Sequence, residues 1–135
     1  MLHQNDIIFE LYKEIDDQNP DKIENILSRL SKTDKKKILS TKFSYLSQFG
    51  KKKYMEKPPM YPLTPIQFAA TTTADDTFKV LMVHGANPYT IVENITGDYT
   101  GYGNDNNMYI GLNSFEIIKH IDMTVYNNYF KKMEI

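Results

Sequence analysis

Three histidines are the residues of this sequence best suited to bind a metal ion. They lie at His3, His84 and His120, a spacing that matches no local ligand motif, and the chain contains no cysteine. A histidine directly before Gly85 is typical of the end of a helix, and His120 lies where a cation would stabilise a helix C-terminus. The sequence therefore predicts neither a metal site nor a cofactor.

Two pairs of adjacent aspartates raise the question of general acid–base catalysis. They are Asp16 with Asp17 and Asp75 with Asp76. Glycosidase-type acid pairs face each other across a cleft, whereas neighbouring acids near a helix end usually stabilise the helix or hydrate a turn. Because no supporting constellation accompanies them, the pattern favours a protein that is not an enzyme. A small enzyme with an unrecognised site stays the alternative.

The polar stretch between Asp98 and Asn106 has the residue types of a calcium loop but not its pattern. The alternating ligands, central glycine and terminal glutamate of such a loop are absent. Gly-Tyr-Gly at 101–103 also lacks the Gly-Lys-Ser/Thr that completes a phosphate loop. Asn, Asp and Gly readily adopt left-handed backbone, so turn formation explains these residues. We expect no small-molecule substrate.

Two lysine runs, at 35–37 and 51–53, have the chemistry to contact nucleic acid or an acidic partner. The net charge of the whole chain is −1, and short basic runs are common on solvated faces. The sequence therefore disfavours a nucleic-acid partner. Weak nucleic-acid binding through the lysine runs stays a second alternative.

Hydropathy and composition give an expectation for the location of the protein. No apolar run approaches the ~20 residues that a membrane span needs, and the first residues lack the basic start and apolar core of a signal peptide. The absence of cysteine fits a reducing compartment. We expect a cytoplasmic protein without a membrane partner. Its Lys-, Asn-, Ile- and Tyr-rich composition also fits a bacterial effector that is delivered to a host cell without a cleaved signal peptide.

The 135 residues fit one domain, and 41% of them are hydrophobic, enough for a core without disulfides. Apolar residues recur at helical spacing in most of the chain. They predict a helix pair at 6–31, an extra helix at 34–49 and a further pair at 113–133. Asn5 is the expected N-cap of the first helix. Three prolines make 51–63 a loop.

The stretch 64–88, "TPIQFAATTTADDTFKVLMVHGANP", predicts two helices joined by a short turn. Thr64 can cap the first helix, with Pro65 at the first helical position, where its missing N–H costs nothing. The second helix runs from Asp75 to His84. Gly85 then ends it with a positive φ.

This stretch resembles one repeat of the ankyrin family. The family pattern Thr-Pro-Leu-His-Leu-Ala-Ala, a polar turn, an apolar helix and Gly-Ala-Asp corresponds to "TPIQFAA" and "FKVLMVHGANP" at matching spacing. The Ala69–Ala70 pair allows neighbouring helices to approach closely. Two residues depart from the pattern. Gln67 replaces a histidine that bridges backbone groups, and Thr73 replaces a glycine whose left-handed conformation strains a β-branched residue.

The segment 89–112 exceeds the length of a standard repeat of about 33 residues, since Thr64 and Ser114 lie 50 positions apart. We interpret it as an insertion. Its ends, "TIVENIT" and "MYIGL", form either a small hairpin or an irregular loop. It is rich in Tyr, Gly and Asn, which is the chemistry of binding loops. The tyrosines alternatively cover the end of the helix stack.

The sequence therefore predicts an all-α fold, a short ankyrin-like stack over residues 1–135 with an extra helix and a long insertion. The resemblance implies a protein–protein interaction module, with another protein as its partner; a bacterial effector and an inhibitor are the roles that fit. By position in the family, and by chemistry for the last two tyrosines, the expected partner-binding residues are Met60, Tyr61, Thr71, Thr72, His84, Tyr99 and Tyr102.

Overall fold

The computed structural model describes residues 4–43, 45, 61–94 and 108–134, with the side chains of 4 and 5 left aside. Within these residues the chain is helical and contains no strand, so the predicted all-α class is confirmed. The elements are α1 (Gln4–Asp16), α2 (Pro20–Ser28), α3 (Lys32–Leu39), α4 (Pro65–Thr72), α5 (Asp75–Val83), α6 (Ser114–Ile121), α7 (Met123–Val125), the π-helix η2 (Tyr126–Phe130) and the 3₁₀-helix η3 (Lys131–Met133).

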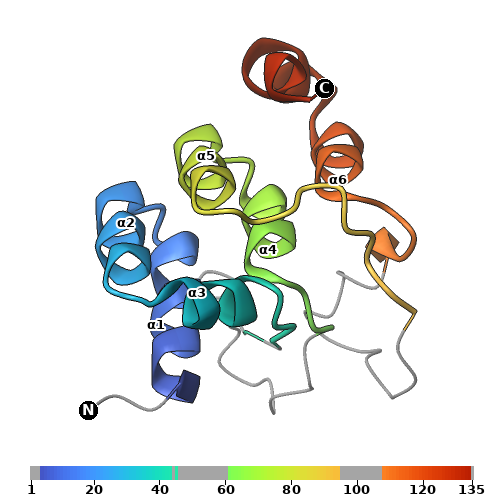
Figure 1. The fold of residues 1–135 in the computed structure, drawn as a ribbon. Helices are drawn as coiled ribbons and strands as arrows, with labels where there is room; N and C mark the ends of the chain where they lie inside the picture. Colours follow the sequence, from blue (N-terminus) through green and yellow to red (C-terminus); the bar gives the residue numbers. More distant parts are fainter. Residues whose placement is uncertain (1–3, 44, 46–60, 95–107, 135) are drawn as a thin grey trace, which may run out of the picture.

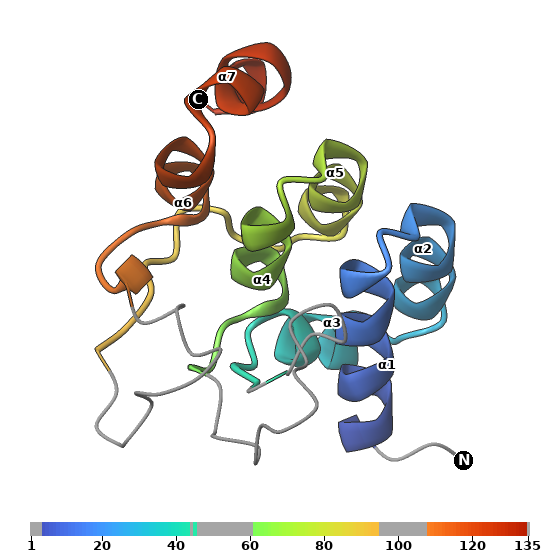
Figure 2. The ribbon, with the colours of Figure 1, turned by 180° about the vertical axis from the view of Figure 1, so that it is seen from behind.

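The helices form two rows (Figures 1 and 2). Helix α4 packs between α1 and α6 in one row, while α2 packs against α5 in the other. Each helix of the first row also contacts the helix that follows it in the second, namely α1 with α2, α4 with α5, and α6 with α7 and η2. Helix α3 crosses one face of this arrangement near α1. The hydrophobic core lies between the rows.

The first two helices, α1 and α2, form where the helical spacing of apolar residues predicts a helix pair. Leu11 and Ile15 on α1 face Ile23 and Leu27 on α2, and all four are fully buried. Gln18 reverses the chain with φ of 57°, and Pro20 starts α2. The prediction of Asn5 as an N-cap is wrong, because α1 already begins at Gln4.

Helix α3 is shorter than the predicted helix 34–49. Ser31 caps it by accepting a hydrogen bond from the backbone N–H of Asp34, and Ser40 ends it. Residues 40–43 are not helical, since Phe43 forms an isolated antiparallel bridge with Leu63. Pairing of this segment with a distant one therefore overrides its helical spacing. Positions 46–49 lie outside the described residues.

Tyr12 joins α1 to these paired segments. Its ring centroid lies 5.2 Å from that of Phe43 and 5.4 Å from that of Phe68. Its buried hydroxyl donates to the carbonyl of Leu63, and the carbonyl of Thr41 lies 3.3 Å away. The ring thus supplies apolar contacts while the hydroxyl satisfies backbone groups that burial would otherwise leave without a partner.

Helix α4 begins as its sequence predicts, since Thr64 and Gln67 form a capping box and Pro65 occupies the first turn. Thr73 follows the helix in the left-handed conformation with φ of 56°, although a β-branched residue is strained there. Gly85 ends α5 with φ of 103°. Ala69 and Ala70 are fully buried, so their small side chains let α1 and α6 pack closely against α4.

The described ends of the segment 89–112 are irregular. A single parallel bridge joins Val92 to Ile110, with the N–H of Gly111 donating to the Val92 carbonyl at 2.8 Å. The described residues therefore match the irregular loop rather than the strands of a hairpin. Beyond it, Asn113 and Glu116 form a second capping box at the start of α6, and Phe130 on η2 packs edge-on against Phe78 of α5.

No helix in the described part of the chain is both long enough and apolar enough to cross a membrane.

The left-handed Thr73 gives a prediction for stability. A β-branched side chain in this conformation costs about 1–2 kcal/mol, whereas glycine adopts it freely but loses about 0.5–1 kcal/mol of chain entropy. Thr73→Gly should therefore raise the free energy of unfolding by roughly 0.5–1 kcal/mol in urea denaturation. Gly85→Ala is the matched control. No atom lies within 4 Å of the added Cβ, so backbone strain alone should lower stability. A Thr73→Gly variant that is less stable than wild type would contradict the assignment of backbone strain to Thr73.

Tyr12 predicts a dependence of stability on alkaline pH. Burial raises the pKa of its phenol well above the ordinary value of 10. As pH rises above about 10, the unfolded chain releases this proton before the folded chain does, so stability falls. Tyr12→Phe should cost about 1–2 kcal/mol at neutral pH, since the buried Leu63 carbonyl loses its donor, but should flatten the alkaline loss. Half-exposed Tyr129→Phe serves as the control in chemical denaturation at several pH values. An unchanged alkaline slope would contradict the prediction.

Candidate functional site: a lysine-lined groove

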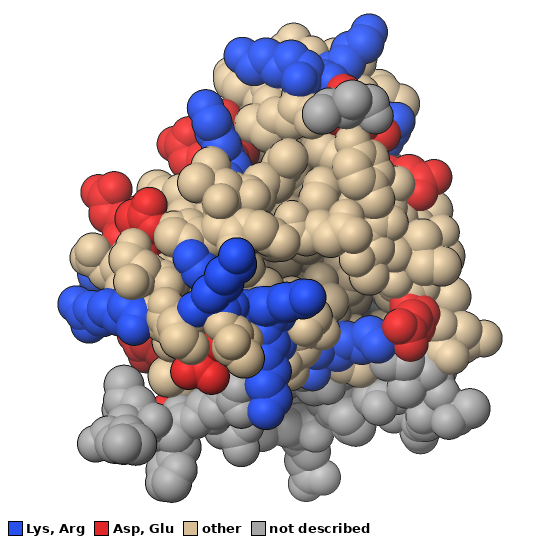
Figure 3. All heavy atoms as spheres, viewed as in Figure 1, with Lys and Arg blue, Asp and Glu red and all other residues tan. Residues whose placement is uncertain are grey.

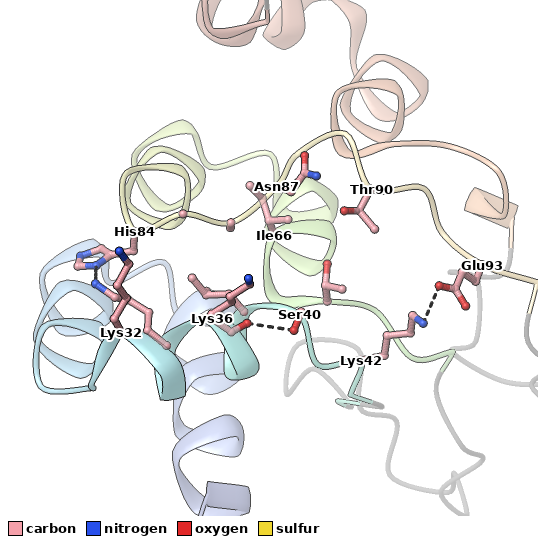
Figure 4. Close-up of a pocket in the computed structure, with 14 residues that line it drawn as sticks. Lys32, Lys36, Ser40, Lys42, Ile66, His84, Asn87, Thr90 and Glu93 are labelled. Atoms are coloured by element: carbon pink, nitrogen blue, oxygen red, sulfur yellow. Dashed lines mark hydrogen bonds and ion pairs between the residues drawn. The ribbon is translucent and has the colours of Figure 1, made fainter.

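An open groove of about 760 Å³ lies on the face of the molecule that carries α3 (Figures 3 and 4). One wall is α3 and the residues that follow it, and the other is the segment that follows α5, with the start of α4 between them. Its lining consists of Lys32, Lys35, Lys36, Leu39, Ser40, Lys42, Thr64, Ile66, His84, Gly85, Ala86, Asn87, Thr90 and Glu93.

Helical periodicity builds the first wall. Residues 32, 35, 36 and 39 lie at i, i+3, i+4 and i+7, so they share one face of α3. The lysines are followed on that face by Leu39, which is buried together with Ile66 and Ala86. The groove therefore has a basic rim above an apolar floor.

Gln67 holds the second wall in place. Its side-chain Oε1 accepts a hydrogen bond from the backbone N–H of Thr64 at 3.0 Å, and its Nε2 donates to the Thr90 carbonyl at 3.2 Å. The side chain is only 1% exposed, so both contacts are made away from water. Gln67 thus bridges backbone groups of two segments, which is the role the resemblance assigns to a histidine at this position.

The charge of the groove is strongly one-sided. Four lysines line it against one glutamate, although the net charge of the chain is −1. Lys42 pairs with Glu93 at 2.9 Å across one end (Figure 4). Within the described residues, Lys32 and Lys36 make no ion pair through their ammonium groups. These two exposed charges are available to an anionic ligand.

His84 connects the groove to α2. Its Nδ1 lies 3.1 Å from Nζ of Lys35, and its Nε2 contacts a carboxylate oxygen of Glu24. Because an ammonium group can only donate, Nδ1 accepts and Nε2 carries the proton that is donated to Glu24. The contact with His84 is the main reason that the pKa of the Glu24 carboxyl is lowered, with a smaller contribution from Ser28. This chain of contacts orients Lys35 at the opposite end from the Lys42–Glu93 pair.

The polar groups of the groove are arranged for binding rather than for proton transfer. The hydroxyls of Thr64 and Ser40 serve as helix caps, and the Glu93 carboxylate pairs with Lys42. In the part of the chain that the structure describes, no three His, Asp or Glu side chains lie close enough together to hold a metal ion. The arrangement offers positive charge and an apolar floor, which together suit an anionic ligand with apolar parts.

Four of the predicted partner-binding residues are described, and they do not share one surface. Tyr61 is 3% exposed, and its hydroxyl donates to the Glu93 carbonyl. Thr71 and Thr72 lie half-buried at the far end of α4, where their hydroxyls donate to carbonyls of their own helix. Of these four described residues, His84 is the one that lines the groove. Met60, Tyr99 and Tyr102 lie outside the described residues.

Two of the groove lysines, Lys35 and Lys36, belong to the run 35–37 that the sequence predicts to be a solvated face, and the sequence singles out neither Lys32 nor Lys42. Leu39 is the residue that could have identified this face of α3 as a binding wall. It continues the helical face of Lys32, Lys35 and Lys36, and an apolar side chain there is expected to pack against another segment. No sequence pattern places the segment 84–93 opposite this face, because the two are far apart along the chain. Their juxtaposition comes from the packing of α2 against α5.

No family model, curated protein or solved structure matches the chain. The function is therefore argued from the geometry of the groove and the residues that build it.

The contact between Glu24 and His84 predicts a dependence of stability on acidic pH. Because the folded chain lowers the pKa of this carboxyl from 4.5, its contribution is present above that value and is lost as pH falls through the lowered pKa. Glu24→Gln should therefore reduce the loss of melting temperature between pH 6 and about 3. Asp76→Asn removes one exposed carboxylate on α5 as a control. If the melting temperatures of wild type and Glu24→Gln fall equally on acidification, the stabilising contact between Glu24 and His84 is refuted.

Proposed function

We propose that the protein is an ankyrin-like interaction module that acts by binding another protein and not by chemistry. The capping of α4 by Thr64, the buried Ala69–Ala70 pair and the left-handed Thr73 support this proposal, since each performs the task that its position has in the repeat pattern. The side-by-side arrangement of α1, α4 and α6 supports it further. A stack of about three units is the smallest that buries its faces.

The binding surface is the lysine-lined groove. The observation that carries this assignment is the combination of two exposed, unpaired lysine ammonium groups on its rim, within the described residues, with a floor of Leu39, Ile66 and Ala86. Interfaces of this kind combine a central apolar contact with a polar rim. We place the binding surface at the groove and not at the residues predicted from the resemblance. Tyr61 is enclosed, and Thr71 and Thr72 lie at the other end of α4. A cytoplasmic location and the role of an effector or inhibitor remain predictions.

The competing proposal of a small enzyme requires titratable groups that converge in a deep pocket. In the groove, His84 is engaged with Glu24 and Lys35, and Glu93 is engaged with Lys42. These contacts are structural, and no hydroxyl or carboxylate stands beside an unengaged base. The geometry therefore favours binding over catalysis.

Site-specific photo-crosslinking tests the assignment of the surface. A photoreactive amino acid replaces Asn87, which is exposed on the rim, and in a matched variant replaces Asn128, which is exposed on η2. After irradiation in cell lysates, we expect a discrete protein adduct from position 87 and none from position 128. Thermal unfolding confirms that both variants fold. Adducts from neither position, or from 128 alone, contradict the proposal that the groove binds a partner protein.

A further inference from the structure

We propose that the partner enters the groove as an extended acidic segment with carboxylates at alternate positions, followed by an apolar side chain. This inference deepens the proposed binding function and rests on it. The carboxylates face Lys32 and Lys36, and the apolar side chain covers Leu39 and Ile66.

The spacing of Lys32, Lys36 and Leu39 on α3 predicts the order of acidic and apolar residues in the ligand. Lys32 and Lys36 lie one helical turn apart on α3, about 6 Å along its axis, and Leu39 follows on the same face. In an extended chain, alternate residues point to the same side and lie about 6.7 Å apart. Side chains i and i+2 of an extended segment therefore match Lys32 and Lys36. The side chain at i+4 lies beyond Lys36 toward Leu39, which is about 4.5 Å further along the helix axis.

The ends of the groove limit the ligand to a short segment. At one end Lys35 is held by His84 and Glu24, and at the other Lys42 is held by Glu93. Within the described residues, Lys32 and Lys36 make no ion pair that would neutralise their positive charge. On the opposite wall, Oδ1 of the exposed Asn87 accepts a hydrogen bond from the backbone N–H of Tyr89 at 2.9 Å, and its NH₂ group can donate to the backbone of such a segment.

The chemistry of the groove favours carboxylates on a peptide over nucleic acid. Its basic residues are lysines, which act as point charges and lack the fork of arginine that binds phosphate in two places. Among the described residues that line it none is aromatic, so these residues offer no surface on which bases could stack. Glu93 and Glu24 at its two ends would repel a continuous phosphate backbone. A short acidic segment avoids both carboxylates.

Binding of a defined peptide to the full chain tests this inference. The probe is fluorescein-labelled Leu-Ser-Glu-Ser-Glu-Ser-Leu, which presents the pattern when read from either end, and the control peptide has Gln in place of Glu. By fluorescence anisotropy we expect the Glu peptide to bind at least about tenfold more tightly than the Gln peptide, and less tightly as salt rises from about 0.05 to 0.3 M.

Charge reversal locates the site. The double variant Lys32→Glu/Lys36→Glu should weaken binding of the Glu peptide by about tenfold or more and should bind a peptide with Lys in place of Glu. The matched variant Lys131→Glu/Lys132→Glu, which reverses two exposed charges on η3, should change binding by less than about twofold. Equal effects of the two reversals would overturn the inference, as would no binding of the Glu peptide up to about 1 mM.

Two further outcomes separate this inference from the proposed function. If position 87 crosslinks to a protein but the Glu peptide does not bind, the chemistry assigned to the partner is wrong while the binding module stands. If an oligothymidine binds more tightly than the Glu peptide and loses affinity in Lys32→Glu/Lys36→Glu, the groove recognises nucleic acid and the acidic segment is rejected.

Discussion

The buried amide of Gln67 is the contact on which the groove depends. A primary amide can be enclosed in a protein only if its donors and acceptor find partners. Here one end caps α4 through the N–H of Thr64, and the other reaches the carbonyl of Thr90 on the segment beyond α5. The same side chain therefore starts a helix and holds the wall that faces α3. The Tyr61 hydroxyl and the Lys42 ammonium group hold the same segment three residues further on, through the carbonyl and the carboxylate of Glu93.

Around this contact, the packing of α4 determines how the other helices are placed. Two fully buried alanines allow α1 and α6 to approach it from opposite sides, and the rings of Tyr12, Phe43 and Phe68 fill the space at its base. Between the rows, Phe78 of α5 contacts Phe115 of α6 and Phe130 of η2. Helix α3 crosses one face of the rows (Figure 1), and its residues form one wall of the groove.

Charge separation connects this architecture to the proposed function. A chain with a net charge of −1 has little long-range attraction for nucleic acid or for an anionic membrane. Folding nevertheless brings four lysines to one groove and engages the glutamates at its ends in pairs. The field that a partner meets is therefore local, positive and sensitive to salt, which suits recognition of a short acidic segment over attraction of a large polyanion.

The sequence by itself determined the features that depend on neighbours along the chain. Thr64 and Pro65 start a helix, Gly85 takes a left-handed conformation, and the apolar spacing identifies the buried faces of α1 and α2, because each of these follows from local backbone preference and periodicity. The left-handed conformation of Thr73 runs against that preference. The tertiary structure alone decided that the extra helix ends at Leu39, since Phe43 pairs with Leu63 twenty positions away. It also enclosed Tyr61 and brought residues 32–42 to face residues 84–93. Such contacts depend on how complete helices pack, and no local pattern encodes which surfaces will meet.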